Sequence, residues 1–197
     1  MQQQPTVALL LTAVTRQRVL APEAAQQLAT FARVVTPPGD TLTAAELPDL
    51  LAGATACLTG WGTPPLTDDL LAAHPDLRLI AHTAGSIRRL VSRAALERGV
   101  RISHTAAVIA EAVAEFVIAQ LFLCLRYPHE LDQAMKAGAP WNTIKDHGIT
   151  GCLLGSQTVG VIGTGRVGRA VIRLLRAFGC RLLAYDPLLT AADAATL

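Results

Sequence analysis

The 197-residue sequence predicts an α/β fold in which parallel strands alternate with helices. Three observations lead to this prediction. Short apolar runs alternate with segments of helical periodicity, and the links between them are short. These runs are continuously apolar, which is typical of parallel strands covered on both faces. Hydrophobic residues make up 51% of the chain and charged residues 16%, so a substantial core can form.

The first part of the chain predicts a complete five-stranded module. We expect helices in the segments between the strands. Pro22 begins the first of these helices, and Pro48 is unfavourable in the interior of the second. Thr67 caps the third helix and Gly99 ends the fourth. The expected strands are 6–13, 33–35, 56–62, 77–84 and 100–104, and the expected helices are 22–32, 43–53, 66–75 and 92–99.

A second module follows a long helix, expected at about 108–127 and closed by Pro128. A polar, irregular arm is expected from His129 to Thr150. A β-α-β pattern then covers 158–163, 166–179 and 181–186. The sequence therefore predicts a substrate domain over 1–107 and a partial nucleotide-binding domain over 108–197.

Three glycines in the second module form a G-x-G-x-x-G frame: Gly163, Gly165 and Gly168. A strand precedes the frame and an amphipathic helix follows it, as dinucleotide binding requires. Gly163 permits the tight turn, Gly165 lets the backbone approach a pyrophosphate, and Gly168 lets helix and strand pack closely. Asp186 ends the next strand, where a carboxylate can accept hydrogen bonds from ribose hydroxyls and repel a 2′-phosphate. The pattern favours NAD over NADP; the alternative is a purely structural turn.

Several motifs resemble the D-isomer-specific 2-hydroxyacid dehydrogenases. In the second module these are a Leu-x-Gly lead-in at Leu153–Gly155, a G-x-G-R-V-G-R helix start at Gly163–Arg169 and a Y-D-P strand end at Tyr185–Pro187. A glycine loop followed by a helix and a strand covers Ala81–Thr105. An Ala-Glu linking helix covers Ala110–Arg126, and the arm contains a tryptophan, Trp141.

The resemblance implies a flavodoxin-like parallel-sheet substrate domain plus the beginning of a Rossmann NAD-binding domain. It implies NAD-dependent, reversible reduction of a 2-oxo acid to a D-2-hydroxy acid, and a homodimer for the full-length protein. It also implies residue roles. Backbone amides at Gly85 and Ser86 would hold the substrate carboxylate, and Thr105 would touch the cofactor near its nicotinamide. Arg166 and Val167 would meet the pyrophosphate, and Asp186 the ribose.

The sequence departs from the family in two places. Many members carry an aspartate where this chain reads Ile87-Arg88-Arg89, which leaves the carboxylate contact and the substrate open. The family's catalytic arginine, acid and histidine lie beyond the Y-D-P strand, so we expect none of them in this chain. We therefore expect an amino-terminal portion of an enzyme, without turnover and poorly soluble alone. Two alternatives stay open: a non-catalytic NAD(H)-sensing or corepressor-like protein, and another dehydrogenase or hydrolase with the same loop.

Composition narrows the remaining possibilities. The net charge is +2 and the basic residues are scattered, which argues against a nucleic-acid surface or a basic membrane patch. The most apolar segment, 116–125, is too short to span a bilayer. Four cysteines without metal-type spacing indicate reduced, mostly buried thiols and no metal site. Without a visible targeting segment, we expect a cytoplasmic protein. His82 and His104, at strand ends near the predicted cleft, could approach a substrate, but we expect them to be hydrogen-bonded structural residues.

Overall fold

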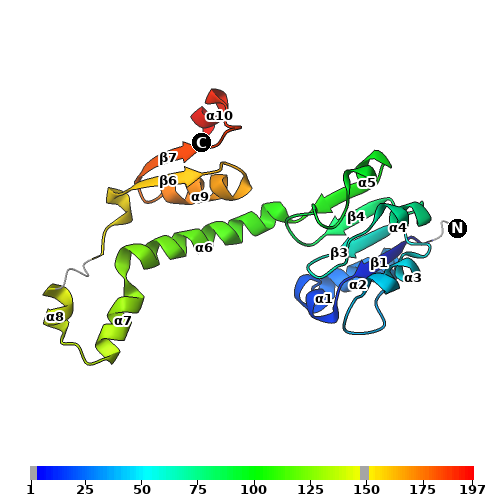
Figure 1. Cartoon of the computed structure of the whole chain (residues 1–197), viewed down its shortest axis with the longest axis horizontal. Helices are drawn as coiled ribbons and strands as arrows, with labels where there is room; N and C mark the ends of the chain where they lie inside the picture. The colour runs from blue at the N-terminus through cyan, green and yellow to red at the C-terminus, as the bar shows by residue number, and fades with distance from the viewer. Residues whose placement is uncertain (1–3, 147–150) are drawn as a thin grey trace. The chain divides into compact units, whose positions relative to one another are not determined.

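The computed structural model describes residues 4–146 and 151–197. The chain forms two compact units, Met1–Ala106 and Ala107–Leu197 (Figure 1). The first contains a five-stranded sheet and the second a two-stranded sheet, each flanked by helices. The predicted α/β class is therefore confirmed.

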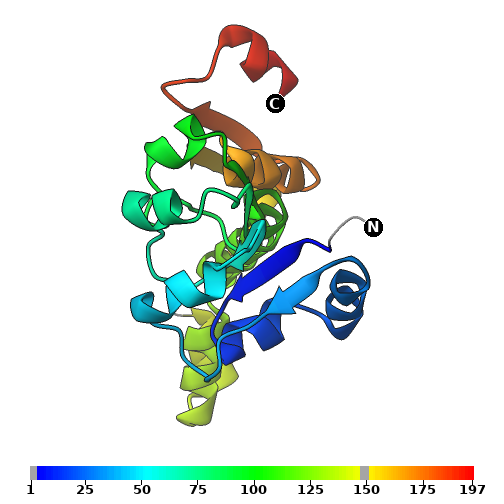
Figure 2. The ribbon, with the colours of Figure 1, turned by 90° about the vertical axis from the view of Figure 1, so that its right-hand side faces the viewer.

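The first sheet is entirely parallel. Its strands lie in the order β2-β1-β3-β4-β5, and Figure 2 shows β1 and β2, in blue, side by side. The chain adds β2 on one side of β1 and β3 on the other, so the order reverses at β1. Ligands of open α/β sheets bind beyond the carboxyl ends of the strands near such a reversal. The strands are β1 (Thr6–Leu10), β2 (Arg33–Val35), β3 (Ala56–Thr59), β4 (Leu79–His82) and β5 (Arg101–His104).

The helices of this unit correct two expectations. The segment predicted as one helix around Pro48 is divided, and Pro48 falls in the first turn of a new helix, where its missing N–H is not needed. The helix α1 was not predicted, because none of its seven residues is buried and no apolar stripe marks it. The elements are α1 (Ala13–Val19), α2 (Pro22–Phe31), η1 (Ala44–Glu46), α3 (Leu47–Leu51), α4 (Asp68–Ala73) and α5 (Arg93–Glu97).

The core of the first unit is aliphatic. Alternate residues of β1 face opposite sides of the sheet, yet Ala8, Leu9 and Leu10 are all at most 2% exposed. Both faces of the central strand are therefore covered, as its continuous apolar run predicts. On one face Ala8 and Leu10 join a cluster that includes Leu51 and Ile80.

The second unit begins with α6 (Ala106–Arg126), close to the predicted long helix. The arm after it was predicted to be irregular, and this is wrong for the described part. Pro128 starts another helix, because Tyr127 adopts a left-handed conformation with φ 51° that redirects the chain. Two helices follow, α7 (Pro128–Lys136) and α8 (Trp141–Asp146). The last part of the predicted arm, 147–150, lies outside the described residues.

The two-stranded sheet pairs β6 (Thr158–Ile162) with β7 (Arg181–Tyr185) in parallel. The helix α9 (Arg166–Arg176) connects them, η2 (Leu154–Ser156) precedes them and α10 (Ala191–Thr196) follows. Val171 and Leu175 pack with Ala114 of α6 and with Val159. The opposite face is open: Ile162 is 87% exposed and its cross-strand partner Tyr185 65% exposed. The expectation of strands buried on both faces fails for this sheet.

The helix α6 corrects the argument made from its length. Its 21 residues have a mean hydropathy of 2.1 in their most apolar stretch, so by length and composition alone it can cross a membrane. Residues 116–125 alone, on which the expectation rested, are too short to span a bilayer. Ala110 and Ala114 are buried and Glu111 pairs with Arg173 of α9, while most of the apolar stretch of α6 is exposed.

Candidate functional site

The glycine frame lies between β6 and α9. Gly163 has φ 91°, a conformation that favours glycine, and its N–H donates to the Tyr185 carbonyl at 2.7 Å. Gly165 is the N-cap of α9 and provides no side-chain hydrogen bond to the helix. The first N–H groups of an α-helix have no acceptor within it. The start of α9 therefore presents free donors with the helix dipole behind them.

Gly168 and Gly165 are glycines for different reasons. A Cβ atom at Gly168 would collide with the carbonyl oxygen of Gly163, so close helix–strand packing requires glycine there. A Cβ atom at Gly165 would meet nothing within 4 Å, and this residue has φ −68°, which any residue adopts. Contacts within the described chain do not require glycine at 165. The open space beside it fits a ligand that approaches the backbone closely.

Asp186 follows β7 and contacts the glycine loop. Its Oδ2 accepts hydrogen bonds from the Thr164 N–H at 2.7 Å and the Thr164 hydroxyl at 3.1 Å, and its Oδ1 accepts from the Leu188 N–H at 2.9 Å. The backbone hydrogen bonds from Leu188 and Thr164, and more weakly the charge of Arg169, lower the pKa of Asp186. The residue therefore presents an ionised carboxylate beside the loop at neutral pH.

Thr164 was not singled out from the sequence. It is 5% exposed and links three parts of the site, because its carbonyl also accepts from Nε of Arg169 at 2.9 Å. No sequence pattern pointed to it, because both partners come together only through the fold. Two other arginines of α9 make contacts: Arg169 donates to the loop and Arg173 pairs with Glu111 of α6. Arg166 lies exposed in the first turn, beside Val167, which is 36% exposed.

In the first unit, the predicted substrate loop follows β4. Gly85 is half-buried and Ser86 exposed. Thr105, directly after β5, donates to the Ala84 carbonyl from its N–H at 3.3 Å and from its hydroxyl at 3.4 Å. The structure therefore brings Gly85, Ser86 and Thr105 together at the carboxyl ends of two adjacent strands. Thr105 braces the loop, a contact that the sequence did not predict.

His82 lies beneath this loop as a hydrogen-bonded structural residue. It is 6% exposed, and its Nδ1 is 3.0 Å from the hydroxyl oxygen of the buried Thr59. Burial first, and then the charge of the neighbouring His104, lower the pKa of His82, while the backbone of Ser86 acts in the opposite direction. His104 is exposed, and its Nδ1 accepts from the Ala106 N–H. His82 is thus neutral at neutral pH.

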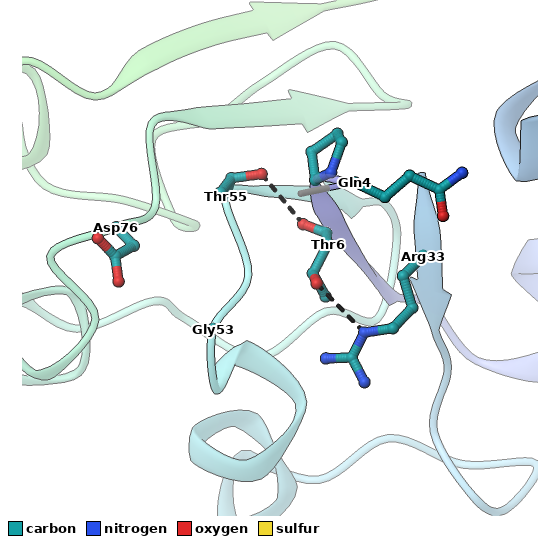
Figure 3. Close-up of a pocket in the computed structure, with 7 residues that line it drawn as sticks. Gln4, Thr6, Arg33, Gly53, Thr55 and Asp76 are labelled. Carbon is teal, nitrogen blue, oxygen red and sulfur yellow. Dashed lines mark hydrogen bonds between the residues drawn. The ribbon is translucent and has the colours of Figure 1, made fainter. Parts of the chain in front are cut away.

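A cavity of about 770 Å³ lies at the opposite, amino ends of the strands (Figure 3). Arg33 and Asp76 lie on different sides of it, and Nε of Arg33 donates to the Thr6 hydroxyl at 3.3 Å. No predicted site residue lines it. Its other lining residues are Gln4, Pro5, Gly53 and Thr55. Within the described ranges, no three His, Cys, Asp or Glu side chains gather closely enough to hold a metal ion.

Comparison with known proteins agrees with this geometry. Residues 118–196 match the family model of the D-isomer specific 2-hydroxyacid dehydrogenase, NAD binding domain. A glyoxylate reductase from Korarchaeum cryptofilum is 31% identical over 127 residues, which are 63% of this chain and 37% of that protein. A D-lactate dehydrogenase from Escherichia coli is 33% identical over 131 residues, 66% of this chain and 38% of that protein.

The fold of the whole chain has counterparts among solved structures. A phosphoglycerate oxidoreductase from Rhizobium etli superposes with a TM-score of 0.71 at 24% identity, over 98% of this chain and 58% of that one. This likeness concerns the fold alone. The chain spans little more than a third of the length of the curated relatives it matches. The matched segment contains the glycine frame, the start of α9 and Asp186, and residues 118–196 are thus similar to the NAD-binding domain of the D-isomer-specific 2-hydroxyacid dehydrogenase family.

Proposed function

We propose that the chain provides the substrate-binding unit and the start of the NAD-binding unit of an oxidoreductase. The enzyme would reversibly reduce a 2-oxo acid to a D-2-hydroxy acid. One observation carries the proposal. The start of α9 has no side-chain cap and has open space at Gly165, and the preceding residue, Thr164, donates a hydrogen bond to the ionised carboxylate of Asp186 directly after β7. A dinucleotide needs both groups, one for its pyrophosphate and one for its ribose.

In the proposed complex, the N–H groups of Arg166 and Val167 bind the pyrophosphate, and the guanidinium of Arg166 adds a positive charge. Asp186 accepts hydrogen bonds from the adenosine ribose through lone pairs that Thr164 and Leu188 leave free. Its negative charge repels a 2′-phosphate, so NAD is preferred over NADP. The bound nicotinamide supplies or accepts the hydride.

The substrate is held by the first unit. The backbone amides of Gly85 and Ser86 bind the carboxylate of the 2-oxo acid, and Thr105 keeps the loop in position. Support comes from the hydrogen bonds of Thr105 to Ala84, which fix the loop against β5. We assign no described side chain to proton transfer. The described residues bind and orient the reactants.

We further propose that the protein is a cytoplasmic homodimer that uses part of α6 as its interface. Val108 is 75% exposed and Phe116 62% exposed, and their spacing places them on one stripe of the helix. Burial of this stripe against a second copy would remove apolar surface from water. The four cysteines are free thiols, as in proteins of reducing compartments.

The test uses the protein expressed from its complete gene. NADH binding is measured by calorimetry, and NADH oxidation is followed with glyoxylate, pyruvate and hydroxypyruvate. Binding followed by oxidation with one of these acids supports the dehydrogenase. Binding without oxidation of NADH by any 2-oxo acid favours the NAD(H)-sensing alternative. Absence of NADH binding at millimolar concentration overturns both.

A further inference from the structure

Three arginines surround a second cavity in the first unit, at the amino ends of β4 and β5. Its volume is about 600 Å³, within the range of small-molecule sites. Each strand has four residues, so this cavity lies roughly 13 Å along the sheet from the loop of Gly85 and Thr105. It is therefore separate from the proposed substrate site. Its side-chain lining consists of Arg78, Arg98, Arg101, Pro75, Leu77 and Leu79.

The three guanidinium groups come from three different segments. Arg78 precedes β4, Arg101 starts β5, and the Arg101 N–H donates to the Arg78 carbonyl at 2.8 Å. Arg98 is the C-cap of α5, and its Nη1 donates to the Asp68 carbonyl at 2.9 Å. The Asp68 carboxylate accepts from the Ser92 hydroxyl. Backbone pairing thus places Arg78 beside Arg101, and the side-chain hydrogen bond to Asp68 holds Arg98 at the same cavity.

Among the residues that the structure describes, no carboxylate side chain lines this cavity. The ion pairs between described residues join Arg93 to Glu97, Lys136 to Asp132 and Arg173 to Glu111, and none involves the three arginines. Arginine stays charged at any physiological pH. Three like charges around one space repel one another, and an anion bound between them relieves that repulsion.

The cavity of Figure 3 differs from the three-arginine cavity in the charge of its lining residues. Its charged lining residues are Arg33 and Asp76, whose charges cancel, and it has no reason to prefer an anion. The three-arginine cavity has a formal charge of +3. Guanidinium groups bind phosphate oxygens in a bidentate manner, which suits them to a compact group with two negative charges. The apolar side chains of Pro75 and Leu79 line the cavity and can contact the carbon atoms of a ligand.

We propose that this cavity is a binding site for a small organic phosphate monoester, at a place distinct from the cofactor and substrate sites. The phosphate dianion lies between Arg78 and Arg101, with Arg98 closing the site from α5. The carbon part of the ligand rests on Leu79, which is 39% exposed. Because the arginines lie at the amino ends of β4 and β5, and Gly85, Ser86 and Thr105 at their carboxyl ends, the ligand would bind at the opposite edge of that sheet.

The experiment titrates the protein with glycerol 2-phosphate at constant ionic strength, by calorimetry and by two-dimensional NMR. We expect saturable binding with shifts of the Arg98 and Arg101 backbone amides. Arg101→Gln and Arg78→Gln should each weaken binding about tenfold or more, as expected for loss of a charged hydrogen bond. Arg18→Gln, which removes an exposed arginine elsewhere in the unit, should leave it unchanged.

The start of α9 is the other place where a phosphate can bind, so the titration is repeated with Gly165→Ala. Retained affinity in that variant supports the three-arginine cavity. Loss of binding in Gly165→Ala, with retained binding in Arg101→Gln, overturns the proposal. Equal weakening by Arg18→Gln, or full competition by an equal concentration of chloride, also overturns it, since either shows a nonspecific charge effect. The NMR shifts locate the site even if an arginine variant folds poorly.

Discussion

Oδ2 of Asp186 accepts a 2.7 Å hydrogen bond from the backbone N–H of Thr164, 22 residues earlier in the chain. This bond joins the end of β7 to the loop that starts α9. It holds the carboxylate in place before any ligand binds, and it also makes Asp186 a structural residue of the loop. A useful variant must therefore separate the charge of Asp186 from its hydrogen bonding.

Asp186→Asn makes this separation. The amide oxygen can still accept from Thr164, so the contact with the glycine loop is kept, while the amide nitrogen can no longer accept from the Leu188 N–H and the negative charge is lost. We expect NADH affinity to fall about tenfold, because an uncharged amide binds the ribose hydroxyls more weakly. We also expect the preference for NADH over NADPH to narrow, because repulsion of the 2′-phosphate disappears. Calorimetry with both cofactors measures the two effects.

Asp193→Asn is the matched control, since it removes an exposed carboxylate of the same unit that lies on α10. It should change neither affinity. If Asp186→Asn binds NADH as tightly as the unmodified protein, Asp186 only braces the loop and the proposed ribose contact is wrong.

The three glycines of the frame predict a contrast between stability and binding. Gly168→Ala places a methyl group against the Gly163 carbonyl and should destabilise the second unit by about 1–3 kcal/mol or more. Gly165→Ala meets no atom of the chain within 4 Å, so its melting temperature should change little, while NADH binding should be lost. Thermal denaturation and calorimetry distinguish the two outcomes.

Gly160→Ala serves as the control for both, because Gly160 also has open space around it but lies within β6. It should melt and bind normally. If Gly165→Ala binds NADH normally, the pyrophosphate does not approach the backbone there, and the binding mode proposed for the start of α9 is wrong.

The lowered pKa of His82 leads us to expect that the stability of the first unit depends on pH. Its pKa in the folded state is lower than the ordinary value of 6.5, so between these two values the unfolded chain binds a proton that the folded chain does not. The free energy of unfolding should therefore decrease as the pH falls below about 6.5, and level off below the folded-state pKa. His82→Asn should lower stability at every pH and flatten this dependence.

Thermal melts at pH 7.5, 6.5 and 5.5 measure the effect. His129→Asn, which replaces an exposed histidine of α7, should keep the pH dependence of the unmodified protein. An unchanged slope in His82→Asn would mean that a group other than His82 causes the pH dependence.

The sequence predicted the elements that local residue patterns determine, and it missed those that depend on contacts between distant segments. The segment from β6 to β7 was predictable because a strand, a glycine frame and an amphipathic helix each leave a local pattern. The helices α1 and α7 left none: α1 buries no residue, and Pro128 reads as a helix end although it starts α7. The bond between Thr164 and Asp186 depends on two segments meeting in space, which no local pattern records.

The expectation of mostly buried thiols is wrong, because Cys57 alone of the four cysteines is buried. Cys57 is 1% exposed and burial raises its pKa to about 12, whereas Cys124 and Cys152 are exposed. The thiolate is the reactive form, so Cys57 should resist iodoacetamide at pH 8 while Cys124 and Cys152 react. After unfolding in guanidinium chloride, Cys57 should react as fast as the others. Peptide mass spectrometry after timed quenching reports each site separately. Rapid alkylation of Cys57 under native conditions would show that β3 opens far more readily than its packed core predicts.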